Sequence, residues 1–70
     1  SLEQLARFEA GTEVTREVLA AENMLRKAKN PVVILGNGEL NVALKVRVQR
    51  VTKGAREKIE SAGGSVEIVA

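Results

Sequence analysis

The stretch from Leu44 to Gln49 alternates strictly between apolar and polar side chains. Successive side chains of a β-strand point to opposite faces, so this pattern predicts a half-buried strand with an apolar inner face. Its outer face would be basic, because it carries Lys45 and Arg47. The chain has only 70 residues and no cysteine, so its apolar core must stabilise the fold without disulfides or thiolate-bound metal.

A capped helix is expected directly after this strand. Thr52 is a candidate N-cap, and the pair Gly63-Gly64 supplies a C-terminal stop. The residues that share the apolar stripe between them are Ala55, Ile59 and Ala62. The last segment, Ser65 to Val69, is predicted to close the chain as a strand.

The amino-terminal part predicts two helices followed by a strand. A short helix would begin with a capping box at Ser1 and stop at Gly11, and Thr15 would cap a second helix from Arg16 to about Leu25. The β-branched apolar run Val32 to Leu35 predicts a buried core strand. The order helix, helix, strand, strand, helix, strand favours one small domain spanning residues 1–70, an α+β (mixed α/β) layer with irregular turns between strands and helix.

The glycine-rich segment Gly36-Asn37-Gly38 after the predicted core strand has two readings. Such glycines occur in phosphate loops, but no Gly-Lys-Ser/Thr ending follows, and Asn-Gly is a common turn dipeptide. A turn is the preferred interpretation.

Residue usage argues against an enzyme. The sequence has no histidine, cysteine or aspartate, so it lacks the usual general base and the usual ligands of zinc and calcium sites. We therefore expect no catalytic residues, no metal, no cofactor and no small-molecule substrate. The longest uncharged run, Asn30 to Gly38, is too short to span a bilayer, so no membrane association is expected.

Charge is unevenly distributed although the net charge is only +2. The middle segment, Arg26 to Lys58, holds nine basic and two acidic residues, whereas the segments before and after it are net acidic. A basic segment of this kind indicates a surface for an anionic partner. The candidate phosphate-binding residues are Arg26, Lys27, Lys29, Lys45, Arg47, Arg50, Lys53 and Arg56. The last five are expected to lie close together, and a phosphate at the start of the Thr52-capped helix would also meet free backbone N–H groups. The alternative is that Lys53 and Arg56 simply pair with Glu57 and Glu60.

Several motifs together resemble one family. The segments that carry the resemblance are Val33-Ile34-Leu35-Gly36-Asn37-Gly38-Glu39-Leu40, Leu44-Lys45-Val46, Val51-Thr52-Lys53-Gly54-Ala55, Ile59, Ala62-Gly63-Gly64 and, upstream, Leu5 to Thr15. They resemble the carboxy-terminal half of bacterial large-subunit ribosomal protein fifteen, and the resemblance covers all 70 residues. It implies a ribosomal, non-enzymatic protein of the cytoplasm that binds large-subunit rRNA, with neighbouring ribosomal proteins as further partners.

Two features depart from that family. Its members carry a long Gly- and Arg-rich amino-terminal extension to which nothing in this sequence corresponds, so the chain looks like a domain excised from a longer ribosomal protein. Val33 stands where the family usually has Lys, which removes one expected cation.

Two function classes follow. The first is an rRNA-binding domain of the large subunit that recognises phosphates and RNA shape and not base sequence. The second is a protein-interaction or self-associating module, because a strand at the carboxy terminus could leave a sheet edge open for pairing.

Overall fold

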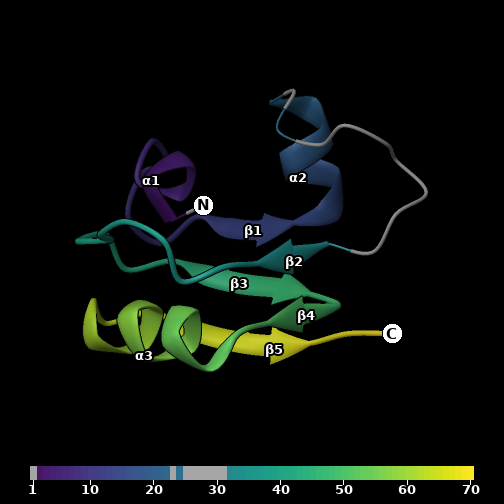
Figure 1. Ribbon diagram of the computed structural model, residues 1–70. Helices are drawn as coiled ribbons and strands as arrows, with labels where there is room; N and C mark the ends of the chain where they lie inside the picture. Colours follow the sequence, from purple (N-terminus) through teal and green to yellow (C-terminus); the bar gives the residue numbers. More distant parts are fainter. Residues whose placement is uncertain (1, 23, 25–31) are drawn as a thin grey trace.

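The centre of the fold is strand β3 (Lys45–Val48), as the computed structural model shows for residues 2–22, 24 and 32–70 (Figure 1). β3 lies between β1 (Glu13–Thr15) and β5 (Ser65–Ile68), and both neighbours run parallel to it. Parallel strands cannot be joined by a tight hairpin, so the chain must cross over between them. The helix α3 (Lys53–Ser61) makes the crossover from β3 to β5.

A second, two-stranded sheet pairs β2 (Val33–Ile34) with β4 (Arg50–Val51), again in parallel. The remaining elements are α1 (Leu2–Leu5) and α2 (Arg16–Ala21). The predicted α+β class is confirmed, and the structure adds two strands to the expected order, β1 and β4. Both are short, and their strand character comes from pairing with a distant partner strand, which a local pattern does not reveal.

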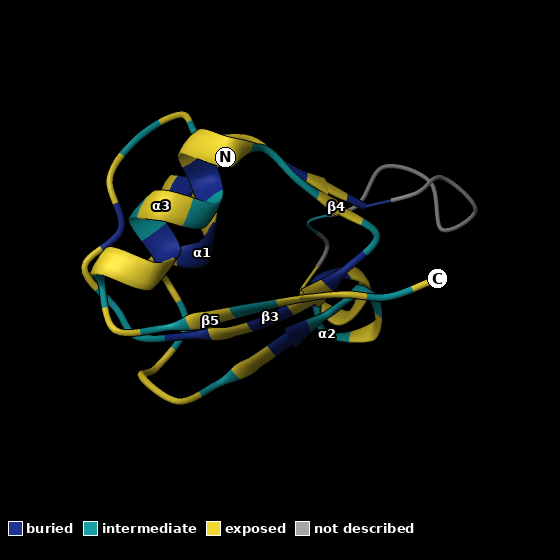
Figure 2. Cartoon of the chain, turned by 90° about the horizontal axis from the view of Figure 1, so that it is seen from below, coloured by how far each residue is buried: buried dark blue, intermediate teal, exposed yellow. Residues whose placement is uncertain are grey.

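The core lies between the three-stranded sheet and the elements that cover one of its faces. Figure 2 shows α1 and α3 on the same side of the sheet, with buried residues where they face it. The predicted inner face of β3 is confirmed. The buried apolar residues are Leu2, Leu5, Val14, Leu19, Val32, Ile34, Leu40, Leu44, Val46, Val48, Ala55 and Ile59.

Within the segment Val32 to Leu35 only Val33–Ile34 forms a strand, and the prediction of a buried core strand is wrong. Val32 and Ile34 are buried, whereas Val33 is 42% exposed and Leu35 is 48% exposed. β2 belongs to the small sheet and turns only one face towards the core, so alternate side chains meet solvent. A continuous apolar run is typical of strands buried on both faces, and here it instead marks a surface with exposed aliphatic groups.

The predicted helix caps are confirmed. The Thr15 hydroxyl accepts a hydrogen bond from the Val18 amide at 3.2 Å, and the Thr52 hydroxyl accepts one from the Ala55 amide at 3.3 Å. α2 ends at Ala21, earlier than the expected end near Leu25. Leu25 and Ser1, the residue of the predicted capping box, lie outside the described residues.

Among the helices that the structure describes, none is long and apolar enough to cross a membrane.

The segment 36–38 is an irregular loop with a bend at Gly38, whose φ is +85°, and it is not a hairpin turn, because β2 runs parallel to its partner strand β4. The loop is attached to the domain through its backbone carbonyls. The Asn37 carbonyl accepts a hydrogen bond from the Leu2 amide at 3.0 Å.

Glycine substitutions at the two ends of α3 should have opposite consequences. Gly63 has φ +89°, so Gly63→Ala should destabilise the protein by about 1 kcal/mol. Gly54 lies in the first turn of α3, where an added Cβ would meet no atom within 4 Å, so Gly54→Ala should be neutral or stabilising by up to about 1 kcal/mol. Urea unfolding midpoints of the two variants check this, and equal shifts would contradict it.

Candidate nucleic-acid interface

The described part of the chain buries no polar or charged side chain. No group of three acidic, histidine or cysteine residues within that part could hold a metal ion. A functional site built from charged groups must therefore lie on the surface, where the predicted cations are.

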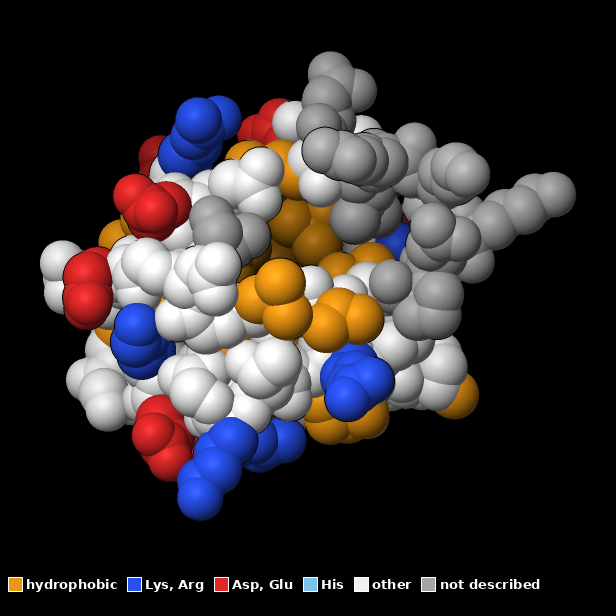
Figure 3. Space-filling model, in the orientation of Figure 1, with side chains coloured by type: hydrophobic (Ala, Val, Ile, Leu, Met, Phe, Trp, Pro, Cys, Tyr) orange, Lys and Arg blue, Asp and Glu red, His pale blue; other side chains and the backbone are white. Residues whose placement is uncertain are grey.

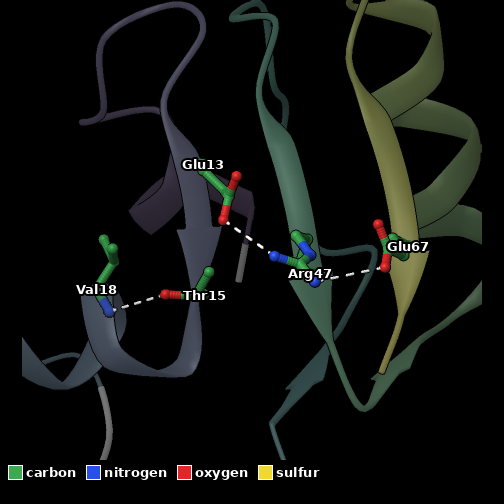
Figure 4. A network of polar contacts seen from close by, with 5 residues as sticks. All are labelled: Glu13, Thr15, Val18, Arg47 and Glu67. Atoms are coloured by element: carbon green, nitrogen blue, oxygen red, sulfur yellow. Dashed lines mark hydrogen bonds and ion pairs between the residues drawn. The ribbon is translucent and has the colours of Figure 1, made fainter. Parts of the chain in front are cut away.

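The predicted phosphate-binding residues fall into three sets. Arg26, Lys27 and Lys29 lie outside the described residues. Lys45 and Arg47 lie on the exposed face of the three-stranded sheet, and Arg50, Lys53 and Arg56 lie on β4 and α3. The expectation that the last five form one group is wrong, because α3 packs on the face of the sheet opposite to the Arg47 side chain (Figure 4). Lys45, two residues before Arg47 on β3 and also exposed, shares the face of Arg47.

Arg47 lies between two carboxylates on the exposed sheet face. Its Nη1 atom donates to Glu13 Oε1 of β1 at 3.3 Å, and its Nη2 atom lies 3.5 Å from Glu67 Oε2 of β5 (Figure 4). The hydrogen bond to Glu13 and the negative charge of Glu67 raise the pKa of Arg47 above its ordinary value. The positive charge of Arg47 is thus balanced within the sheet, which makes this residue a weak candidate for a phosphate contact.

Lys45 lies one row further along the same sheet face. The strand register places it between Glu13 and Ser65. The two cations and two carboxylates of the exposed face therefore cancel, and the sequence pattern of β3 alone suggested a more basic face than the assembled sheet has.

The cations around the start of α3 have fewer carboxylate partners than those on the exposed sheet face. Arg50 and Lys53 are exposed, and neither takes part in an ion pair within the described residues. Arg56 pairs with Glu60 one turn later, at 3.9 Å, with both side chains about half exposed. Such an exposed pair is weak, roughly 0.3–0.5 kcal/mol, so Arg56 stays able to exchange partners.

The first turn of α3 offers backbone donors beside these cations. The Ala55 amide is bonded to the Thr52 hydroxyl and the Arg56 amide to the Thr52 carbonyl. The amides of Lys53 and Gly54 form no hydrogen bond with any described residue. The positive end of the helix dipole and two open N–H groups therefore lie beside Arg50, Lys53 and Arg56, which is an arrangement suited to an anion.

Two exposed aliphatic side chains border this group. Val33 is paired in register with Arg50, and Leu35 follows on the same face of β2. Figure 3 shows hydrophobic side chains at the surface over β2, directly beside a basic side chain over β4, with more basic side chains over the start of α3. Val33, which stands where the resembled family usually has Lys, thus occupies a surface position beside the candidate phosphate-binding residues.

Lys58 has a structural role that the sequence did not reveal. Its Nζ atom donates to the Gly36 carbonyl at 3.0 Å and to the Gly38 carbonyl at 2.8 Å, and lies 4.0 Å from Glu39 Oε1. These partners are about 20 positions upstream, so no local pattern could indicate them. Lys58 links the glycine-rich loop to α3, and its ammonium group is already hydrogen-bonded to two backbone carbonyls.

Comparison with known proteins identifies relatives over nearly the whole chain. A family model that describes the ribosomal proteins 50S-L15 and 50S-L18e together with their 60S counterpart matches residues 1–67. The large ribosomal subunit protein uL15 of Nostoc sp. is 52% identical over 69 residues, which is 99% of this chain and 47% of that protein. The uL15 protein of Lactobacillus acidophilus is 44% identical over the same length and the same shares.

The chain thus spans about half the length of the curated relatives that it matches. The resemblance seen in the glycine and helix motifs is confirmed. The chain belongs to the family of the ribosomal proteins 50S-L15 and 50S-L18e and their 60S counterpart.

Proposed function

We propose that this chain is a structural, non-enzymatic part of the large ribosomal subunit in the cytoplasm and binds rRNA through its surface at β4 and the start of α3. The observation that carries the proposal is the grouping of Arg50, Lys53 and Arg56 around two unbonded helix amides in a chain whose relatives are large-subunit proteins. Arg26, Lys27 and Lys29 stay candidate contacts on sequence grounds.

The chemistry of this surface suits phosphates and RNA shape. Cationic side chains and backbone N–H groups contact phosphate oxygens without reading bases. The chain has a single aromatic residue, Phe8, and its side chain packs against the core. Stacking of RNA bases on exposed aromatic rings is therefore a poor explanation for binding. The aliphatic side chains of Val33 and Leu35 could lie against ribose groups next to the bound phosphates.

The salt dependence of RNA binding tests the proposal. Three phosphate contacts at about 0.7–0.9 each predict a log–log slope of roughly −2 to −3 for a large-subunit rRNA fragment, and up to about −5 if Arg26, Lys27 and Lys29 also make contacts. Arg50→Ala and Lys53→Ala should each make the slope shallower by about one unit and weaken binding to unrelated structured RNA by a similar factor. Filter binding or fluorescence anisotropy over a salt series measures both quantities.

Two matched arginine variants serve as controls. Arg47→Ala should change the slope by less than Arg50→Ala, because Arg47 is already paired with Glu13 and Glu67. Arg7→Ala, in the acidic first segment, should have little effect. If Arg7→Ala or Arg47→Ala weakens binding as much as Arg50→Ala, attraction depends on net charge alone, and the surface at β4 and α3 is not the RNA-binding site.

A further inference from the structure

No strand in the described part of the chain pairs with the outer edge of β5. β5 is a terminal strand of the three-stranded sheet, with β3 on its inner side. Figure 2, which views the molecule from below, shows β5 as the nearest strand, with α3 beside it on the covered face of the sheet and no described segment along its outer edge. An uncovered strand edge presents unpaired backbone groups, which natural proteins usually protect.

The ladder between β5 and β3 shows which backbone groups face outward. The Ser65 amide donates to the Leu44 carbonyl at 2.9 Å, and the Val69 amide donates to the Val48 carbonyl at 3.0 Å. Because a parallel ladder uses every second residue of a strand, the N–H and C=O groups of Val66 and Ile68 point away from β3. These two residues could receive an added strand without loss of any bond within the sheet.

The side chains on this edge specify the chemistry of the added strand. On the exposed face, Arg47 of β3 forms ion pairs with Glu13 of β1 and Glu67 of β5, so this group of charges crosses all three strands and holds one positive and two negative charges. Glu67, at the open edge, has a side chain that is 64% exposed. On the other face, Ile68 is one of the large apolar side chains left exposed, at 48%.

We propose that the outer edge of β5 binds an extended segment of another protein that carries a Lys or Arg next to an apolar side chain. The cation would lie beside Glu67 and extend the alternation of charge across the sheet, and the apolar side chain would cover Ile68. A second copy of this chain fits less well, because Glu67 is the only charged residue of β5 and a two-fold related strand would bring like charges together.

The experiment uses the 70-residue chain and the probe peptide acetyl-Thr-Val-Lys-Val-Lys-Val-Thr-amide. Backbone amide NMR shifts and hydrogen exchange are followed during the titration. Exchange at Val66 and Ile68 should slow by at least about tenfold at saturation, since these amides become hydrogen-bonded. The amides of β3 should keep their exchange rates. The same peptide with glutamate in place of both lysines should bind at least about two- to fivefold more weakly, the range expected for an exposed ion pair.

Three variants locate the binding. Glu67→Gln should weaken binding of the lysine peptide about two- to fivefold, whereas the matched change Glu13→Gln, on β1 at the opposite edge of the same sheet face, should have a smaller effect. Ile68→Pro removes an outward N–H and no bond to β3, so it should abolish binding while the fold, read from the β3 amides, is kept. If this variant unfolds, the comparison of Glu67→Gln with Glu13→Gln decides the question.

Other results would overturn the proposal. The first is peptide binding at a site other than β5, and the second is equal binding of the lysine and glutamate peptides. The third is no binding at about 1 mM peptide, a concentration at which a binding free energy near −4 kcal/mol is detected. Concentration-dependent shifts at Val66 and Ile68 without peptide would indicate a second copy of the chain as the occupant. The RNA measurements use a different surface, so the two proposals can fail separately.

Discussion

Ile59→Ala is expected to remove most of the stability of the protein. Ile59 lies on the inner stripe of α3 and is 0% exposed, in the core cluster that also contains Leu44, Val46 and Val48. Truncating a buried isoleucine to alanine costs about 2–5 kcal/mol, because the transfer energy of the lost groups and the energy of the remaining cavity add. A domain of this size is expected near the low end of about 5–15 kcal/mol, so the variant should be largely unfolded under mild denaturant.

Denaturant unfolding followed by circular dichroism measures this effect. Ile68→Ala is the matched control, because it makes the same chemical change at a side chain that is 48% exposed. The control should shift the free energy of unfolding by no more than about 1 kcal/mol. Equal losses in the two variants would show that α3 does not turn Ile59 towards the core.

Gly64→Ala is expected to be the most damaging glycine substitution. A Cβ at Gly64 would collide with the carbonyl oxygen of Leu44 and would lie 2.9 Å from the Leu44 amide nitrogen and 3.1 Å from the Ile59 carbonyl oxygen. All three are backbone atoms, so relief requires movement of the chain itself. The same region carries the hydrogen bonds from the Gly64 amide to Ile59 and from the Ser65 amide to Leu44, both 2.9 Å.

The expected cost is about 3 kcal/mol or more, at or beyond the upper end for overpacking, because flexible side chains cannot absorb the clash. Gly63→Ala provides the comparison, since an added Cβ there meets only the Ala43 Cβ at 3.6 Å and the cost of about 1 kcal/mol comes from its positive φ. Thermal or urea unfolding of both variants checks the order. A larger loss for Gly63→Ala than for Gly64→Ala would contradict the close approach of β5 to the start of β3.

The structure of the candidate site was only partly predictable. The sequence identified Arg50, Lys53 and Arg56 and the helix start beside them, because cation spacing and an N-cap are local features. It did not reveal that Glu13 and Glu67 balance Arg47, since these carboxylates are 34 and 20 positions away in the chain and come together only when three strands pair.

The same division holds for the fold. Alternation in β3, the Thr15 and Thr52 caps and the stop at Gly63 followed from the sequence, because each depends on hydrogen bonds or side-chain directions within a few residues. Only the tertiary structure decided which strands are neighbours, and hence that one face of β2 meets solvent and that Lys58 binds the carbonyls of a distant loop. The physical reason is that strand pairing depends on contacts between residues far apart in the chain, which leave no periodic signal in either partner.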